Sequence, residues 1–371
     1  MPGAPSPVRV AAGPSLGGRD ASIHPVLTRS RWLAILLMLG AAGVLVVIAA
    51  LRVGAEDISF SQAARILLQT IREWPAGEAS HDPAAIILIQ VRLPRILLSF
   101  MVGGCLAAVG VGLQALLRNP LADPYVLGIS SGAALGAAMA LLLGIGTTVF
   151  AVSALPLCAF AGGLISILLV YRVAVSYGHL PVHTLLLAGV ILNAIFSALI
   201  MFITSIAEPN RSFGIMSWLM GTLMAPDYLA LAALAVYLLV GGLILFRQGG
   251  ALNLLTLGEE SARALGVEVE RVKKAVFLSS ALMTGAVVSV SGLIGFVGMV
   301  IPHAMRLLVG ADHRLLLPAA ALAGGMFLTL ADALARTLLA PGEIPVGVVT
   351  ALVGGPVFIY LLMAKKGGLI R

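Results

Sequence analysis

Long apolar runs without charge alternate with short polar segments along most of this chain. The first run, from Trp32 to Leu51, contains no charged residue and is long enough to cross about 30 Å of hydrocarbon. Nine further runs follow at about 94–117, 125–145, 149–171, 183–206, 228–246, 272–290, 294–309, 315–338 and 345–364. The pattern predicts an all-α integral membrane protein with about ten transmembrane helices.

The first 28 residues differ from the rest of the chain. They are rich in Pro, Gly, Ser and Arg and show no apolar periodicity, which predicts a flexible cytoplasmic tail over residues 1–28. The apolar run that follows is longer than the core of a secretory signal peptide, so we expect it to be retained as a membrane span. Residues 29–371 are then expected to form a single transmembrane domain.

The positions of Lys and Arg predict how the spans are oriented. If the N-terminus lies in the cytoplasm, sixteen of the 23 Lys and Arg residues fall on the cytoplasmic side of the ten spans and seven on the outer side. Cytoplasmic loops of membrane proteins carry such an excess of basic residues. We therefore expect both termini in the cytoplasm, which an even number of spans also requires.

Composition supports the membrane assignment and argues against a nucleic-acid partner. Hydrophobic residues make up 60% and charged residues 11% of the chain, against roughly 25% charged residues in a soluble domain. The net charge of +7 comes from residues scattered between apolar runs, with no basic stretch interleaved with aromatics. Cys105 and Cys158 both fall inside apolar runs, where we expect small buried side chains.

Two polar connections are predicted to have structure of their own. Apolar residues recur at helical spacing over Ile58–Trp74, which is typical of an amphipathic helix on the outer membrane surface. The longest cytoplasmic connection, 247–274, has acids that favour a helix start and a natural helix stop at Gly266. A second short helix is expected from near Val267, which makes this connection a helix–turn–helix facing the cytoplasm.

The predicted spans contain few groups that could carry chemistry. Asp332 and Arg336 are four residues apart, hence on one helix face, and taken alone they indicate an ion pair that snorkels to the outer interface. His303 has no other ligand type at metal-binding spacing, so it is expected to be a packing residue and no metal site is predicted. The chain also lacks a phosphate-binding loop of the G-x-x-x-x-G-K-[ST] type. We expect no enzymatic activity and no bound cofactor; if ATP drives transport, ATP and Mg²⁺ must be held by a second protein that pushes on the helix–turn–helix.

Glycines at regular spacing predict close contacts between helices. Gly128, Gly132 and Gly136 line one face of the third span, and three more glycines between residues 292 and 298 surround the start of the eighth. Small residues let helix backbones approach closely in lipid. The turn over residues 119–124, Asn-Pro-Leu-Ala-Asp-Pro, is expected to be stiff.

Several ordered motifs resemble one family of membrane proteins. They are Arg92–Arg95 (RLPR), Leu116–Pro124 (LLRNPLADP), Leu127–Gly132 (LGISSG), Gly258–Gly266 (GEESARALG), Gly292–Arg306 (GLIGFVGMVIPHAMR) and Glu343–Pro356 (EIPVGVVTALVGGP). Together they resemble the FecCD family, the permeases of type II ABC importers for ferric siderophores, haem and cobalamin. The match runs from about residue 90 to the C-terminus.

This resemblance implies the partners and the location of the chain. It implies a homodimer of ten-helix subunits in the bacterial inner membrane, with the substrate path between the subunits and membrane lipid around them. Two copies of a separate ABC ATPase subunit are expected below, with ATP and Mg²⁺ on that subunit. A periplasmic substrate-binding protein is expected above.

The resemblance also implies roles for individual residues. Outward-facing arginines that receive acidic residues of the binding protein match Arg92, Arg95 and Arg336; an exposed pair of this kind mostly improves encounter and register. The coupling helices that enter the ATPase groove match about 257–270. Their named positions are Glu259, Glu260, Ser261, Arg263, Ala264, Leu265 and Gly266. Positions of the cytoplasmic gate match Asn119, Leu121, Val182 and His183.

The substrate is the least determined part of the interpretation. An iron chelate is expected, with haem slightly favoured over a ferric siderophore, because His183 stands where the cobalamin permeases have a small hydroxylated residue. Four methionines in the path region point the same way: Met201, Met216, Met220 and Met224. Cobalamin stays open as an alternative within the family, and a secondary transporter driven by an ion gradient stays open outside it.

Overall fold

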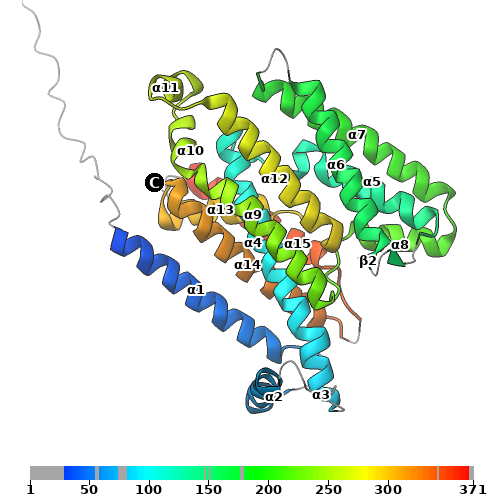
Figure 1. The fold of residues 1–371 in the computed structure, drawn as a ribbon. Helices are drawn as coiled ribbons and strands as arrows, with labels where there is room; N and C mark the ends of the chain where they lie inside the picture. Colours follow the sequence, from blue (N-terminus) through cyan, green and yellow to red (C-terminus); the bar gives the residue numbers. More distant parts are fainter. Residues whose placement is uncertain are drawn as a thin grey trace, which may run out of the picture.

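The computed structural model describes residues 29–54, 58–73, 82–145, 148–149, 152–175, 179–340 and 342–366. The predicted tail over residues 1–28 and Trp74 of the predicted amphipathic segment lie outside these ranges. The described chain is almost entirely helical (Figure 1). Its helices are α1 (Arg29–Arg52), α2 (Phe60–Glu73), α3 (Pro83–Ile86), η1 (Ile87–Arg92), α4 (Leu93–Leu116), η2 (Pro124–Leu127), α5 (Ile129–Leu142), α6 (Ala154–Ala174), α7 (Val182–Ile206), α8 (Pro209–Leu219), α9 (Tyr228–Arg247), α10 (Gly249–Leu255), α11 (Glu259–Ala264), α12 (Val269–Ser291), α13 (Val297–Val309), α14 (His313–Thr337) and α15 (Val346–Lys366).

Ten apolar helices coincide with the ten predicted runs, which confirms the all-α membrane fold class. Seven of them have the length and composition of membrane spans: α1, the continuous helix from α3 to α4, α6, α7, α9, α12 and α14. The other three, α5, α13 and α15, contain shorter apolar segments. Two strands of two residues each, β1 (Thr148–Val149) and β2 (Val152–Ser153), pair antiparallel before α6.

Helix α4 is the centre of the bundle (Figure 1). It packs against α14, α12, α13 and α9, and most of its residues are buried. The contact with α14 brings the two backbones together, because a Cβ on Gly103 would collide with the Gly324 carbonyl oxygen. Polar groups bridge the same contact, where the hydroxyls of Ser99 and Thr329 lie 3.1 Å apart. In lipid, backbone approach of this kind replaces the hydrophobic force that holds soluble helices together.

A second group of helices, α5, α6 and α7, packs beside this centre. The predicted glycine face of the third span is confirmed in α5. A Cβ on Gly132 would meet Ser166 and the Gly162 carbonyl oxygen of α6, and one on Gly136 would meet the backbone of Cys158. Cys105 is buried as predicted, whereas Cys158 is partly exposed.

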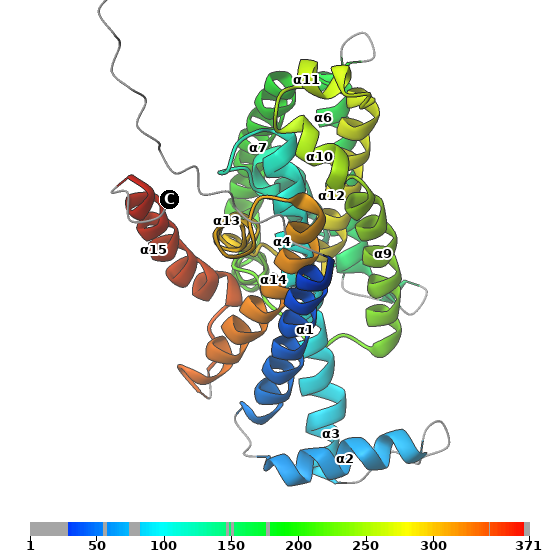
Figure 2. The same cartoon turned by 90° about the vertical axis from the view of Figure 1, so that its left-hand side faces the viewer.

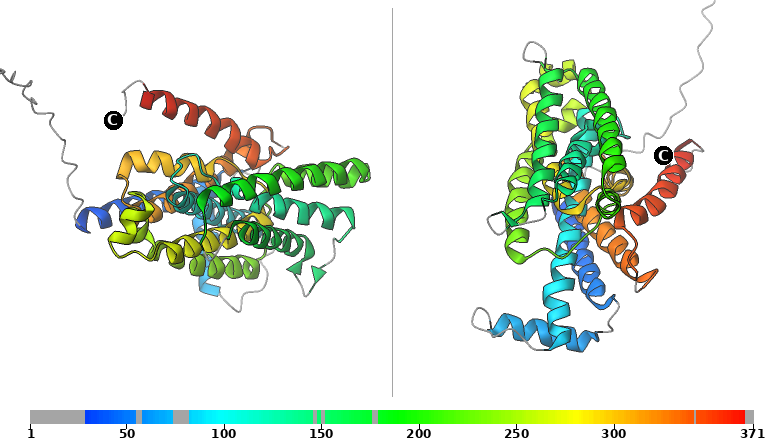
Figure 3. Two further views of the ribbon diagram at one scale, coloured as in Figure 1. Left: turned by 90° about the horizontal axis from the view of Figure 1, so that it is seen from above. Right: turned by 90° about the vertical axis from the view of Figure 1, so that its right-hand side faces the viewer.

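Two helices lie at the margin of the bundle (Figures 2 and 3). Helix α1 runs alongside α14 and buries only 11% of its apolar segment inside the chain. Helix α15 contacts α13 and α14 but stands away from the other helices. Large apolar side chains on α15 remain exposed, including Leu352, Ile359 and Tyr360.

The chain is non-helical between α12 and α13, and this stretch packs against two other parts of the chain. The predicted eighth span, 294–309, begins three residues later than expected, because Gly292 (φ +64°) ends α12 and the chain becomes helical again only at Val297. The non-helical residues between them pack against the segment that follows α8 and against the first turn of α15. A side chain on Gly221 (φ +75°) or on Gly347 would collide with the Leu293 carbonyl oxygen. Gly295 has open space around it, so packing does not require a glycine there.

Short helices mark the two ends of the bundle (Figure 2). Helix α2 lies across one end and α11 lies at the other. The predicted amphipathic helix is confirmed as α2, with Ala63 and Ile66 buried and Arg65 and Leu68 exposed. The predicted second short helix from near Val267 is wrong, because the chain enters the long helix α12 at Val269 and continues without interruption to Ser291. Helix α10 provides the other short helix of this connection, and α8 was not predicted.

Candidate functional site

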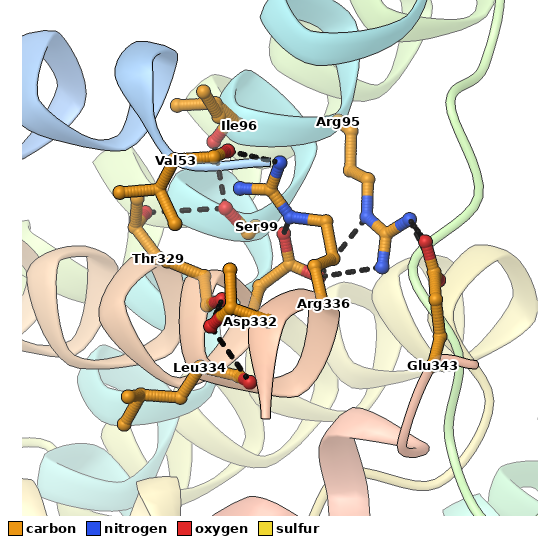
Figure 4. A network of polar contacts seen from close by, with 11 residues as sticks. Val53, Arg95, Ile96, Ser99, Thr329, Asp332, Leu334, Arg336 and Glu343 are labelled. Carbon is orange, nitrogen blue, oxygen red and sulfur yellow. Dashed lines mark hydrogen bonds and ion pairs between the residues drawn. The ribbon is translucent and has the colours of Figure 1, made fainter. Parts of the chain in front are cut away.

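A buried carboxylate links two long helices at the α2 end of the bundle (Figure 4). Asp332 of α14 is fully buried. Its Oδ1 accepts a hydrogen bond from Nε of Arg95, in α4, at 3.0 Å. Its Oδ2 lies 3.1 Å from Nε of Arg336, one turn later on α14. Two guanidinium groups therefore neutralise one carboxylate, and the predicted placement of Asp332 and Arg336 on one helix face is confirmed.

Arg95 also reaches the loop between α14 and α15. Its Nη1 donates to both carboxylate oxygens of Glu343, at 2.9 and 3.1 Å. The Glu343 side chain is 54% exposed, whereas that of Arg95 is 13% exposed. Arg95 therefore stands between a fully buried acid and an acid that faces solvent.

Backbone carbonyls at the end of α1 hold the other two arginines. Nη1 of Arg92 donates to the Leu51 carbonyl at 2.9 Å, and Nη1 of Arg336 donates to the Val53 carbonyl at 3.0 Å. These carbonyls belong to the last turn of α1 and the residue after it, where a positive charge is favourable. Gly54 lies against the Arg92 guanidinium, and a Cβ on Gly54 would come within 2.9 Å of three of its atoms.

The structure brings the three arginines predicted for docking into one cluster but alters their exposure. The expected exposed pair is wrong for Arg92, which is only 4% exposed. The predicted snorkelling of Asp332 and Arg336 is also wrong, since Asp332 is 0% exposed and Arg336 is 8% exposed. The reason is that a carboxylate and several backbone carbonyls converge on these guanidinium groups from α1 and α14.

The segment predicted for ATPase coupling forms α11 at the other end. Gly258 (φ +119°) precedes this helix, and Gly266 (φ +85°) terminates it in a left-handed conformation, as predicted. Ala262 anchors the helix in the core. Of the predicted coupling positions, Glu259 is half-buried and the remaining six are exposed: Glu260, Ser261, Arg263, Ala264, Leu265 and Gly266.

An almost fully buried lysine ties α11 to α12. The Lys273 side chain is 3% exposed, and its Nζ lies 3.0 Å from Glu270 and 3.2 Å from both carboxylate oxygens of Glu259. Arg263 lies 3.6 Å from Glu259 and 3.7 Å from Glu270. Two acids and two bases from two helices therefore form one network on the inner side of α11.

The predicted gate positions lie in the turn before η2 and in the first turn of α7. Leu121 N–H donates to the Asn119 side chain at 2.9 Å, which fixes the turn that leads into η2. Helix η2 packs against α7. Val182 is the first residue of α7, and the next, His183, has an exposed side chain. Asn119 and Leu121 are exposed as well.

Asp123 is the buried acid of the same turn. Its Oδ1 accepts the Tyr125 N–H at 3.0 Å. Burial raises the pKa of the Asp123 carboxyl to about 6, and the hydrogen bond from Tyr125 opposes this shift. The stiffness predicted for residues 119–124 thus has two sources, the side-chain bonds of Asn119 and of Asp123.

The charged residues in these two clusters that were not selected as site residues from the sequence are Asp332, Glu343, Glu270 and Lys273. Glu270 and Lys273 are three apart, a spacing that indicates an ion pair on one helix face. Glu343 belongs to a motif already noted. No local pattern predicts the partners of the last three. Lys273 contacts Glu259, Glu343 contacts Arg95, and Glu270 contacts the α6–α7 connection, and each partner is distant in sequence.

The described residues offer no group of three or more His, Cys, Asp and Glu side chains placed to hold a metal ion. His303 of α13 lies against the ring of Phe358 on α15, with ring centroids 6.2 Å apart at 71°. Its position at a helix contact agrees with the packing role predicted for it.

Comparison with known proteins identifies the family. The model of the FecCD transport family matches residues 39–364. The chain belongs to the FecCD transport family. It is 40% identical over 334 residues to the hemin transport system permease protein HmuU of Yersinia pestis, covering 89% of this chain and 96% of that protein. It is 44% identical over 303 residues to the cobalamin import system permease protein BtuC of Halobacterium salinarum, covering 79% of this chain and 80% of that protein.

A solved structure agrees with the family. An ABC transporter assigned to the metal-chelate type, in an inward-facing conformation, superposes with a TM-score of 0.74 at 32% identity and covers 90% of this chain and 99% of that one. This FecCD chain is thus the permease subunit of a type II ABC importer and a multi-pass membrane protein. ATP hydrolysis in this family takes place on a separate ATPase subunit, and the family implies a periplasmic binding protein as a second partner.

Proposed function

We propose that this permease moves an iron chelate from the periplasm to the cytoplasm across the bacterial inner membrane, with haem favoured over a ferric siderophore. The observation that carries the choice of haem is the extent of the likeness to the hemin permease, which covers 89% of this chain and 96% of that protein. The exposed side chain of His183 supports it, because an imidazole is a ligand of haem iron. Exposed methionines on α7 and α8 offer further soft contacts for an iron chelate.

Cobalamin is the second candidate cargo. The cobalamin permease of Halobacterium salinarum has the higher identity, 44%, although over a smaller share of both chains. The two cargoes differ in what His183 should do. If haem passes the gate, His183→Ala should lower uptake and His183→Met should retain part of it, since methionine is also a haem ligand. If cobalamin passes, a small side chain at this position should be tolerated.

Uptake into proteoliposomes tests the cargo. Vesicles contain two copies of this chain, its ATPase subunit and, outside, its binding protein; haem, a ferric siderophore and cobalamin are offered separately with and without internal ATP. ATP-dependent entry of haem or of the siderophore supports the proposal. Entry of cobalamin alone contradicts it, and ATP-independent uptake driven by a proton gradient would contradict the importer mechanism itself.

Binding-protein docking is assigned to the arginine cluster at the α2 end. Arg95 is the member of the cluster best placed to meet a carboxylate from outside, because its partner Glu343 faces solvent and guanidinium groups bind carboxylates in a bidentate way. Arg92 and Arg336, which are held by carbonyls, add positive potential behind it. Arg95→Glu should weaken binding-protein association at least tenfold and reduce its salt dependence. Arg65→Glu on the exposed side of α2 carries the same charge change as a control, and unchanged affinity in Arg95→Glu would remove the cluster from the interface.

The exposed side of α11 is assigned to the ATPase subunit. This helix projects at the opposite end from the arginine cluster (Figure 2), so we place that end, and both termini, in the cytoplasm. Glu260→Gln is expected to lower transport-coupled ATPase activity, because it removes an exposed charge from the contact surface while leaving the network of Lys273 intact. ATPase activity coupled as in the wild type would contradict the assignment.

Residues 1–28 stay assigned to a cytoplasmic tail, and the exposed apolar face of α15 is proposed to meet a second copy of the chain.

A further inference from the structure

Glu270 connects three parts of the chain that are separate in sequence. It lies in the first turn of α12, and its Oε1 is 3.0 Å from Lys273 Nζ and 3.7 Å from Arg263 of α11. Its Oε2 accepts a hydrogen bond from the backbone N–H of Leu180 at 2.8 Å. His179 Nδ1 lies 3.6 Å from Oε1. One carboxylate thus joins α11, α12 and the residues that precede α7.

The backbone bond to Leu180 is the informative contact. Leu180 is 1% exposed, so its N–H has no access to water and needs an acceptor inside the protein. Only Pro181, which has no N–H to donate, separates it from Val182, the first residue of α7. A displacement of Glu270 therefore acts on the start of α7 directly, without an intervening flexible segment.

The α11 region is also fixed to a third helix. Asn253 of α10 donates to Asp312 at 2.8 Å and accepts from the backbone N–H of His313 at 2.8 Å, at the start of α14. Since α10 packs against α11, the short helices are anchored on α14 by this contact and on α12 by Lys273. Of these contacts, the one made by Glu270 leads to the segment that carries Val182 and His183.

We propose that Glu270 is a positioning residue that transmits displacement of α11 to the N-terminal end of α7, by holding Leu180 N–H on one oxygen and the cations of α11 and α12 on the other. This inference rests on the proposed function, in which α11 meets the ATPase subunit and Val182 and His183 stand at the gate. Loss of the link uncouples ATP hydrolysis from substrate entry. Glu270 itself contacts neither ATP nor substrate.

Variants at Glu270 test the link through the ratio of substrate transported to ATP hydrolysed. Glu270→Ala removes both sets of contacts and should lower this ratio at least fivefold while ATP hydrolysis by the assembled complex persists. Glu270→Gln can still accept the Leu180 N–H but lacks the charge, so it should recover part of the ratio. Glu208→Gln is the control, because Glu208 forms an exposed ion pair with Arg211 at the far end of α7. A ratio unchanged from wild type in both Glu270 variants would overturn the proposal.

A distance measurement keeps the proposal testable if Glu270→Ala assembles poorly. Spin labels at Thr256→Cys and Leu187→Cys, in a chain carrying Cys158→Ser, report the separation of the α10–α11 turn from the exposed face of α7. In the complex with the ATPase subunit, this distance should stay the same with and without ATP, because α7 follows α11. In Glu270→Gln, the distribution of distances should broaden once ATP is added. A distance that changes with ATP in the otherwise native chain would show that α7 does not follow α11. Absence of transport in the wild type, with this distance still fixed, would instead count against the proposed function.

Discussion

The two ends of the bundle each hold a cluster of arginine or lysine with two acids, but the clusters differ in what surrounds them. At the α2 end, Asp332 is fully buried and bridges the long helices α4 and α14. At the α11 end, the carboxylates of Glu259 and Glu270 are 26% and 23% exposed and bridge a six-residue helix to its neighbours. A buried pair is costly to break, whereas partly hydrated pairs can exchange partners with water. The α2 end is therefore suited to fixed geometry, and the α11 end to displacement.

Asp332→Ala should be the most damaging change in either cluster. It leaves the guanidinium groups of Arg95 and Arg336 facing each other without their shared counter-ion, which costs about 4 kcal/mol by analogy with broken buried pairs. Thermal unfolding in detergent measures the loss. Glu343→Gln removes the other acid bound to Arg95 but from an exposed position, and should cost at most about 1 kcal/mol. Equal losses in the two variants would show that burial does not decide which acid of this cluster contributes more to stability.

Gly103→Ala tests the close contact between α4 and α14. The added Cβ would meet the Gly324 carbonyl and Leu328 Cβ, so α4 and α14 must separate, at an expected cost of about 3 kcal/mol. Unfolding of the detergent-solubilised chain measures this as well. Gly40→Ala in α1 meets no atom within 4 Å and should be neutral or slightly stabilising because alanine favours a helix. An unchanged stability in Gly103→Ala would show that α4 and α14 can separate without loss of stability.

Asp123 separates the effect of burial from the effect of ion pairing. Unlike Asp332, which lies between two guanidinium groups, Asp123 accepts a hydrogen bond from a backbone N–H, and its pKa is raised to about 6 in the folded chain from 3.8. Because the folded pKa is the higher one, its stabilising contribution is complete below pH 3.8 and is lost as the pH rises through about 6. Asp123→Asn keeps a side-chain oxygen for Tyr125 N–H and should be more stable than wild type by roughly 3 kcal/mol at pH 8. The gain should vanish near pH 4, and a gain independent of pH would exclude titration of this carboxyl as its source.

Lys273→Met should change stability less than Asp332→Ala, Gly103→Ala or Asp123→Asn. Methionine fills the volume of the buried stem, and the partly hydrated carboxylates of Glu259 and Glu270 keep Arg263 nearby, so we expect a loss of about 1 kcal/mol. Ionic strength separates the contributions, since added salt should destabilise the wild type more than the variant, which lacks the lysine charge and keeps the pairs of Arg263. A loss as large as that of Asp332→Ala would mean that the α11 end is as rigid as the other.

The parts that could be predicted from the sequence are those set by local pattern. Apolar runs locate the ten helices, and Gly266 locates the end of α11, because hydrophobicity and glycine conformation act over a few residues. The start of α13 was misplaced because the non-helical stretch after Gly292 is held by contacts of the Leu293 carbonyl with Gly221 and Gly347, which are distant in the chain. The exposure of Arg92 was wrong for the same reason. Its partner is the Leu51 carbonyl of α1. Neither the sequence at the end of α1 nor the sequence around Arg92 shows that the two will meet.

The six-residue π-helix η1 determines what a change of one residue in the length of the chain does at this point. Leu93 N–H bonds to the Leu88 carbonyl, five residues back rather than four, so the helix holds one residue more here than an α-helix would. Deleting a single residue between Ile87 and Arg92 would let regular α-helix form there, and the helix upstream would keep the same face toward α1 and α2, because the π turn holds the extra residue locally. Ala85, now buried against the end of α1 and α2, would stay buried. The same deletion within the regular helix α4 would turn everything upstream by about 100°, so homologous permeases that lack one residue in η1 should carry α2 at the same angle.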